Sequence, residues 1–135
     1  MVIDTEILLR LFIAVVVGGI IGYERRKVHK PAGLRTHMLV CLGASLFTVV
    51  GITAFSSADP SRVVAGIVTG IGFLGAGTIF RAKDTVKGLT TAASLWAVAA
   101  IGITVGLGEY VIMTTATVLV ILILQLNKIE YFREI

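Results

Sequence analysis

The strongest constraint on the fold is a series of five apolar segments, each 17 to 20 residues long, joined by short polar connections. At about 1.5 Å per residue, a helix of this length spans roughly 25–30 Å, the hydrocarbon thickness of a bilayer. Only 15% of the residues are charged, whereas a soluble domain carries roughly 25%. The pattern predicts an all-α polytopic membrane protein with about five transmembrane helices in one domain, residues 1–135. The segments are Ile7–Tyr23, Thr36–Phe55, Val63–Phe80, Leu89–Gly106 and Tyr110–Leu126.

The first apolar segment lacks the features of a cleavable secretory signal. Asp4 and Glu6 precede it in place of a basic region, and no clear cleavage site follows it. We therefore expect this segment to be retained as a membrane-spanning helix.

Lysine and arginine residues gather on one side of the predicted membrane, and this sets the orientation. With the N-terminus outside, ten of the twelve fall on the inner side, in the connections after the first and third segments and near the C-terminus. Only Arg10 and Arg62 fall on the outer side. The positive-inside rule therefore predicts five spans with the N-terminus outside and the C-terminus inside.

The first four segments also contain a weak internal repeat. Each half has an arginine, a glycine eight positions later, and a G-L-x-T motif after a further 14 or 17 intervening residues. This spacing favours two parallel hairpin repeats followed by a closing fifth helix. The repeat positions are Arg10, Gly18 and Gly33–Thr36 in the first half, and Arg62, Gly70 and Gly88–Thr91 in the second.

The stretch "GIGFLGAG" (Gly70–Gly77) contains the G-x-G-x-x-G pattern of dinucleotide-binding folds. That fingerprint requires a preceding strand and an acidic residue about 20 positions later. Here the stretch lies inside an apolar segment, and the corresponding position is Thr90. The context excludes a nucleotide-binding reading.

Small residues instead let transmembrane helices approach closely. Because its glycines cover more than one side, we expect the third helix to be central, with neighbours on several faces. The alternative is a helix broken at this stretch, with backbone groups exposed to a ligand. The predicted helix-packing glycines are Gly18, Gly22, Gly70, Gly72, Gly75, Gly77, Gly102 and Gly106.

Three blocks carry a resemblance that covers nearly the whole chain. They are "GIIGYERRKVHKPAGLRTHMLVCLGA" (Gly19–Ala44), "GIGFLGAGTI" (Gly70–Ile79) and "GLTTAASLWAVAAIGITVGLG" (Gly88–Gly108). In this order and spacing they resemble the MgtC/SapB family of bacterial and archaeal membrane proteins. One departure is Gly66, where the family commonly has glutamine.

The resemblance implies a multi-pass protein of the cell inner membrane with about five helices, no enzymatic activity and no cofactor. Some members are linked to growth at low magnesium, to stress adaptation and to the survival of pathogens inside macrophages. Longer members carry a soluble C-terminal domain. Since this sequence ends at Ile135, we expect a short form without it.

The inner ends of the predicted helices carry the first candidate binding site. An arginine and hydroxyl groups at two helix N-termini favour a bound anion or carboxylate. The alternative is an ion pair that locks the first hairpin. The basic connection also attracts anionic lipid, at about 1 kcal/mol per basic residue. The predicted residues are Glu24, Arg25, Arg35, Thr36, Thr90 and Thr91.

Arg10 and Arg62 form the second candidate site, on the outer side. A charged residue at membrane depth is costly without a partner, so both arginines are predicted to face one central cavity. The alternative is that they snorkel to the outer head groups. His29 and His37 have no cysteine or acidic partner at ligand spacing, so no zinc site and no catalytic set are predicted.

Two classes of function fit these features. The first is a small regulatory membrane protein that binds another membrane protein. The second is a transporter or channel for a small ion or solute whose pore forms in a homo-oligomer, with a dimer as the expected form. No nucleic-acid partner is expected for either class.

Overall fold

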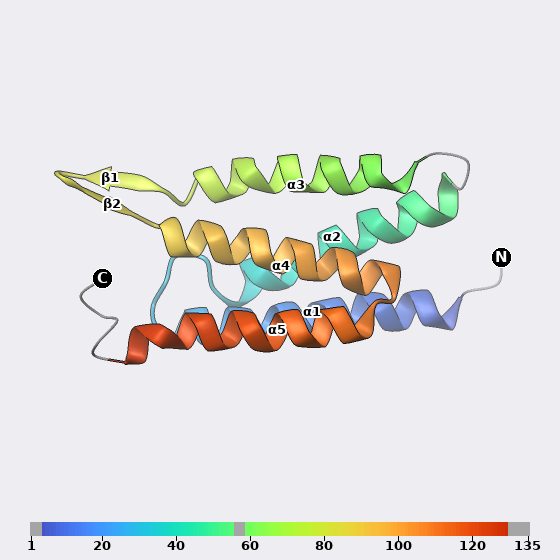
Figure 1. Cartoon of the computed structure of the whole chain (residues 1–135), viewed down its shortest axis with the longest axis horizontal. Coiled ribbons are helices and arrows are strands. Elements are labelled where there is room, and N and C mark those ends of the chain that lie inside the picture. Colours follow the sequence, from blue (N-terminus) through green and yellow to red (C-terminus); the bar gives the residue numbers. More distant parts are fainter. Residues whose placement is uncertain (1–3, 56–58, 130–135) are drawn as a thin grey trace.

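The computed structural model describes residues 4–55 and 59–129. Within these residues, five α-helices run roughly along one axis (Figure 1). They are α1 (Thr5–Lys27), α2 (Leu34–Ala54), α3 (Pro60–Ala76), α4 (Leu89–Leu107) and α5 (Tyr110–Gln125), the last continued by a 3-10 turn, Leu126–Lys128.

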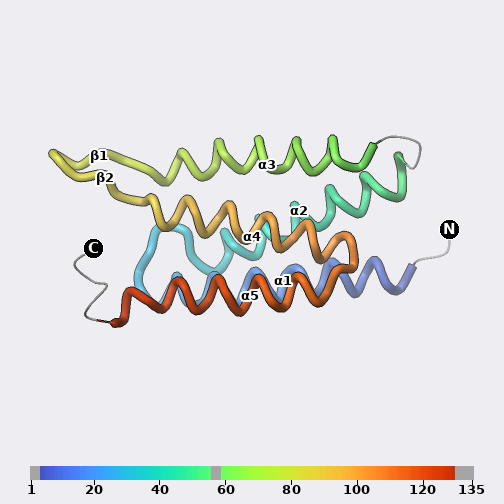
Figure 2. Tube along the Cα trace, viewed as in Figure 1, coloured from blue at the N-terminus to red at the C-terminus, as the bar shows by residue number. Residues whose placement is uncertain are grey.

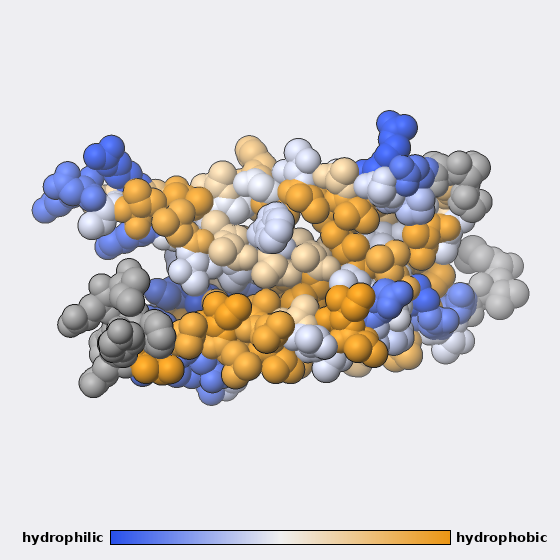
Figure 3. Space-filling model, viewed as in Figure 1, coloured by the Kyte–Doolittle hydropathy of each residue, from blue (hydrophilic) through white to orange (hydrophobic). Residues whose placement is uncertain are grey.

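The predicted all-α membrane fold is confirmed. Four of the helices are long and apolar enough to cross a bilayer, and the 17-residue α3 is a shorter apolar helix. Hydrophobic side chains cover the middle of the visible face, whereas hydrophilic ones gather at both ends (Figure 3). This distribution fits a bundle whose middle lies in lipid and whose ends lie in water.

The connection between α3 and α4 is a short β-hairpin that the hydropathy pattern did not predict. Strands β1 (Phe80–Ala82) and β2 (Thr85–Lys87) pair antiparallel. The third segment was expected to continue to Phe80, but α3 ends at Ala76. The Thr78 hydroxyl donates to the Gly75 carbonyl at 2.8 Å, and this bond helps to turn the chain out of the helix. Phe80, the last residue of the expected segment, begins β1.

The expectation of a central third helix is wrong, because α4 occupies the centre. Helix α4 contacts each of the other four helices, and α3 lies at the edge of the bundle (Figure 2). Only Ile71 and Gly75 of α3 are buried. The helix runs unbroken from Pro60 to Ala76, so it also lacks the break considered above.

The glycines of α3 therefore do not share one role. A Cβ atom added at Gly70 or Gly72 would meet nothing within 4 Å. One at Gly75 would touch Ala92 of α4 at 3.6 Å, and one at Gly77 would meet carbonyls of its own helix end. The packing prediction is wrong for Gly70 and Gly72 within the chain, because small residues permit a close approach without causing one.

Close helix packing occurs instead at the two faces of α2. A Cβ atom added at Gly18 would lie 2.6 Å from the carbonyl oxygen of His37, and one at Gly102 would lie 2.5 Å from that of Cys41. Real Cβ atoms do not approach so closely, so the backbone of α2 sits directly on α1 and on α4. The glycines at these seams are Gly18, Gly22, Gly102 and Gly106.

The two halves of the sequence repeat thus pack differently. Gly18 and Gly70 hold equivalent places in the repeat, yet Gly18 touches α2 whereas Gly70 is open. The core explains the difference, since residues such as Ala14, Ile21 and Val98 bury their side chains among α1, α2, α4 and α5. Helix α3 lies outside this cluster.

We predict that leucine at Gly18 or Gly102 destabilises the protein, while leucine at Gly70 does not. The first two substitutions force a side chain into the backbone of α2, and overpacking costs about 1–3 kcal/mol or more. The apparent Tm in detergent should fall by at least about 5 °C for these variants and stay unchanged for Gly70→Leu. Equal Tm values for all three variants would contradict the packing described here.

The orientation is tested by thiol labelling in a Cys41→Ala background. Glu109 and Lys83 are both exposed and lie beyond opposite ends of α4. With the N-terminus outside, Glu109→Cys should react with a membrane-impermeant reagent added to intact cells, and Lys83→Cys should react only after lysis. The opposite labelling pattern would reverse the orientation.

Candidate functional site

A buried ion pair lies near the C-terminal end of α1. Glu24 and Arg25 are only 8% and 2% exposed, and Nη1 of Arg25 lies 3.8 Å from Oε2 of Glu24. Arg25 follows the buried Ile21 by one helical turn, which places it on the packed face of α1. Nε and Nη2 of Arg25 have no hydrogen-bond partner among the described residues. The guanidinium is therefore buried with most of its donor capacity unused.

His37, which was not among the predicted site residues, connects three parts of this end of the bundle. Its side chain is fully buried, with Nδ1 2.9 Å from the Gly33 carbonyl oxygen and Nε2 3.1 Å from Oγ of Ser94. Because a carbonyl only accepts, Nδ1 carries a hydrogen and donates to Gly33. The interaction with Ser94 crosses 57 sequence positions, so no local sequence pattern indicates it.

The Ser94 hydroxyl suits both protonation states of this imidazole. When the ring is neutral, Ser94 donates to Nε2. When the ring is protonated, Nε2 donates to Ser94, whose hydroxyl then donates to the Thr91 carbonyl oxygen at 2.8 Å. Helices α2 and α4 are thus joined by a polar link near their N-terminal ends.

The predicted inner-side site is divided by the structure. Glu24, Arg25 and Thr91 are buried in the bundle, whereas Arg35, Thr36 and Thr90 are exposed. The prediction that all six form one site is wrong, because three of the side chains face the packed interior and three face outward. Thr90 and Thr91 show this directly, since only Thr91 faces the packed interior.

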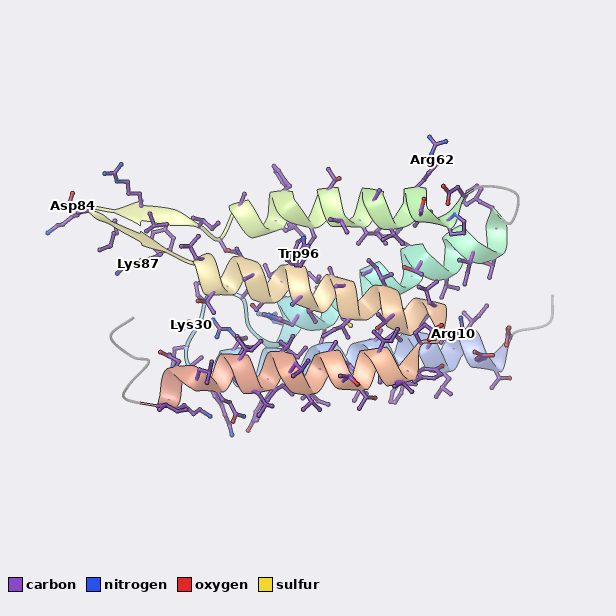
Figure 4. The ribbon with its side chains drawn as sticks, viewed as in Figure 1. Arg10, Lys30, Arg62, Asp84, Lys87 and Trp96 are labelled. Atoms are coloured by element: carbon purple, nitrogen blue, oxygen red, sulfur yellow. The ribbon has the colours of Figure 1, made fainter. Side chains whose placement is uncertain are left out.

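Arg35 and Thr36, but not Thr90, line an open hollow of about 780 Å³ at the connection between α1 and α2. We call it the basic hollow. Arg26 comes from the end of α1, Lys30 from the connection, and Arg35 and Thr36 from the first turn of α2. Figure 4 shows Lys30 at this end of the bundle. The remaining lining residues are His29, Pro31, Gly33 and Leu34.

The two outer arginines do not face one cavity, which corrects the second site prediction. Arg10 is partly buried, pairs with Glu6, and donates through Nη1 to the Gly106 carbonyl oxygen at 2.8 Å. Arg62 is exposed on α3 and points away from the bundle (Figure 4). Arg10 therefore links α1 to the end of α4, where carbonyls lack intrahelical partners.

An apolar groove of about 530 Å³ runs between α2 and α3, with α4 as its floor. We call it the α2–α3 groove. Glycines on both sides leave the groove open. A Cβ atom added at Gly43 of α2, or at Gly66 or Gly70 of α3, would have no neighbour within 4 Å. The larger lining side chains include Phe47 and Leu74.

Metal ligands are not grouped in the part of the chain that the structure describes. Residues 4–55 and 59–129 contain no set of three or more histidine, cysteine, aspartate or glutamate side chains arranged to hold an ion. Cys41, the only cysteine in the sequence, is buried in the core.

The apolar helices with polar ends define a polytopic α-helical membrane protein. The profile of the MgtC family matches residues 11–131, and the chain belongs to this family. It is similar to the putative magnesium transporter YhiD of Escherichia coli K12, with 41% identity over 136 residues that cover 95% of this chain and 63% of the relative.

Two proteins named MgtC are also similar to the chain. The protein of Brucella abortus strain 2308 is 48% identical over 108 residues, which cover 80% of this chain and 45% of the relative. The protein of Salmonella typhimurium is 45% identical over 114 residues, covering 84% and 49%. The chain thus spans less than two thirds of the length of these relatives. No solved structure matches it.

We predict that Glu24→Gln lowers the free energy of unfolding by roughly 1–3 kcal/mol, because it leaves the buried Arg25 without a counter-charge. The exposed Arg35→Gln serves as the matched control and should change stability by less than about 0.5 kcal/mol. The double variant Glu24→Gln/Arg25→Gln should recover part of the loss. Additive losses in denaturant titrations in detergent would show that the two side chains do not interact.

Proposed function

We propose that this protein supports growth at low magnesium as a small regulatory protein of the inner membrane, and that it acts by binding a transmembrane helix of another membrane protein. Membership of the MgtC family and the similarity to a relative named as a putative magnesium transporter support the link to magnesium. The proposed role includes no catalysed reaction.

The α2–α3 groove is the observation that carries the proposed mode of action. Its lining is apolar and it lies between two apolar helices, so its occupant is a membrane component. Along α3 the lining extends from Val63 to Leu74, a length of roughly 17 Å or about three helical turns.

A partner helix suits this groove better than a flexible acyl chain does. Gly66 and Gly70 are spaced i, i+4 on one face of α3 and have no neighbour in the chain. Such a face lets a second helix backbone come close, and close packing is the main attraction between helices in lipid. Lipid tails gain little from the same surface, because they are equally well solvated by other lipids.

The proposal is tested by filling the groove without disturbing the fold. The variant Gly66→Leu/Gly70→Leu places two side chains in the groove at positions with free space. Gly72→Leu is the matched control, because Gly72 is equally open but does not line the groove. In a strain whose growth at low magnesium depends on this protein, we expect the double variant to lose growth and the control to retain it.

Protein abundance and Tm are measured in parallel for both variants. A cysteine placed at Leu39, in the groove, is used to cross-link the partner. A docking role is supported if the double variant loses both growth and this cross-link at normal abundance. Normal growth of the double variant contradicts it, as does growth that simply follows abundance. A cross-link between two copies of this chain would show that the groove binds a second copy instead of a different protein.

A homo-oligomeric transporter or channel is the second candidate function. The specific support is the name of the relative from Escherichia coli, the putative magnesium transporter YhiD, at 41% identity. A flux assay with the purified protein in liposomes separates the two candidates. Magnesium flux that requires the purified protein, and that the groove variant blocks, would favour transport over partner binding.

A further inference from the structure

We infer that the basic hollow binds a phosphate group, carried either by a lipid headgroup or by a soluble molecule. This site lies outside the α2–α3 groove, and the inference does not depend on the proposed function. Failure of either proposal leaves the other intact.

The positive charges that line the hollow favour binding of an anion. Arg26, Lys30 and Arg35 line one cavity, and none of its described lining residues is acidic. Three like charges around one space repel each other, and an anion among them removes that repulsion. The nearest carboxylate along the chain, that of Glu24, is buried beside Arg25 on the packed face of α1.

The donors of the hollow suit phosphate oxygens. Guanidinium groups form paired hydrogen bonds to phosphate, and an ammonium group adds a compact charge. The hydroxyl of Thr36 is a further donor in the lining. The first turn of α2 also forms part of the wall, and its leading N–H groups have no partner within the helix.

The hollow is a built site rather than a loose basic loop, because buried residues hold its wall in place. The backbone N–H of Lys30 donates to the Arg25 carbonyl oxygen at 3.1 Å. The carbonyl of Gly33 accepts from the His37 backbone N–H at 3.2 Å and lies 2.9 Å from Nδ1 of its ring. Arg25 and His37 are 2% and 0% exposed. The connection is thus anchored at both ends to the interior of the bundle.

The size and position of the hollow favour a phosphate ester over a lone carboxylate. A volume of about 780 Å³ accommodates a headgroup-sized ligand. The hollow also lies at the polar end of two apolar helices. One position after Arg26 on α1, the ammonium of Lys27 sits 4.8 Å from the ring centre of Tyr23. Aromatic and basic side chains of this kind are typical of the headgroup region.

The test compares two triple variants of the chain 1–135 that lose the same charge. The hollow variant is Arg26→Gln/Lys30→Gln/Arg35→Gln. The control is Arg81→Gln/Lys83→Gln/Lys87→Gln, which removes three exposed cations from the β-hairpin. Because all six residues are exposed, both variants should keep the wild-type Tm in detergent.

Each protein is titrated in detergent at about 0.15 M salt with phosphatidic acid, phosphatidylcholine, glycerol 3-phosphate and inorganic phosphate. Native mass spectrometry measures the ligand retained per chain. We expect one phosphatidic acid per chain, with affinity at least about tenfold weaker in the hollow variant and less than about twofold weaker in the hairpin variant.

The soluble probes identify the source of the phosphate. If glycerol 3-phosphate or inorganic phosphate binds with the same dependence on the hollow, the site takes soluble phosphates. If only phosphatidic acid does so, the site takes a lipid headgroup. Equal losses in the two variants would reduce the effect to general charge attraction and overturn the inference. If the wild-type protein retained as much phosphatidylcholine as phosphatidic acid, or retained none of the probes, the inference would be overturned as well.

Discussion

The close contact of α2 with α1 and α4 is the constraint on which the rest of the structure depends. Without a hydrophobic driving force between helices in lipid, their association depends on backbone approach and polar links. Gly18 on α1 and Gly102 on α4 provide that approach from opposite sides of α2. Helix α2 is thereby held between two neighbours, and α4 becomes the centre of the bundle. Helix α3 contacts the outer surface of this unit.

This arrangement also explains the polar features at the end of the bundle where α2 and α4 begin. Once α2 is fixed against α1, His37 is buried at the start of α2, where it reaches the Gly33 carbonyl and the Ser94 hydroxyl. The same packing buries Arg25 and turns Arg35 outward. Burial of a charge is costly unless it is paired, so the Glu24–Arg25 pair is sensitive to any shift of α2. The connection between α1 and α2 then has a defined shape and forms the basic hollow.

Both proposed binding regions are bounded by α2. Its first turn forms one wall of the basic hollow, and residues from Leu39 to Phe47 form one wall of the α2–α3 groove. The two regions differ in chemistry, since the hollow carries cations at a polar end and the groove is apolar along the helices. The proposed phosphate and the proposed partner helix would therefore contact separate surfaces of α2. His37 ties the start of that helix to α4 through Ser94.

The sequence by itself determined the fold class, the family and the approximate helix positions, because segments of 17 to 20 apolar residues have few alternatives to membrane helices. It also identified the basic connection between α1 and α2. Only the tertiary structure decided which glycines are packed: Gly18 touches a neighbour and Gly70 does not, although both lie in small-residue patterns. It likewise separated Arg25 from Arg35 and joined His37 to Ser94 across 57 positions. The physical reason is that composition sets where a helix can lie, whereas burial and pairing depend on which neighbour covers each of its faces.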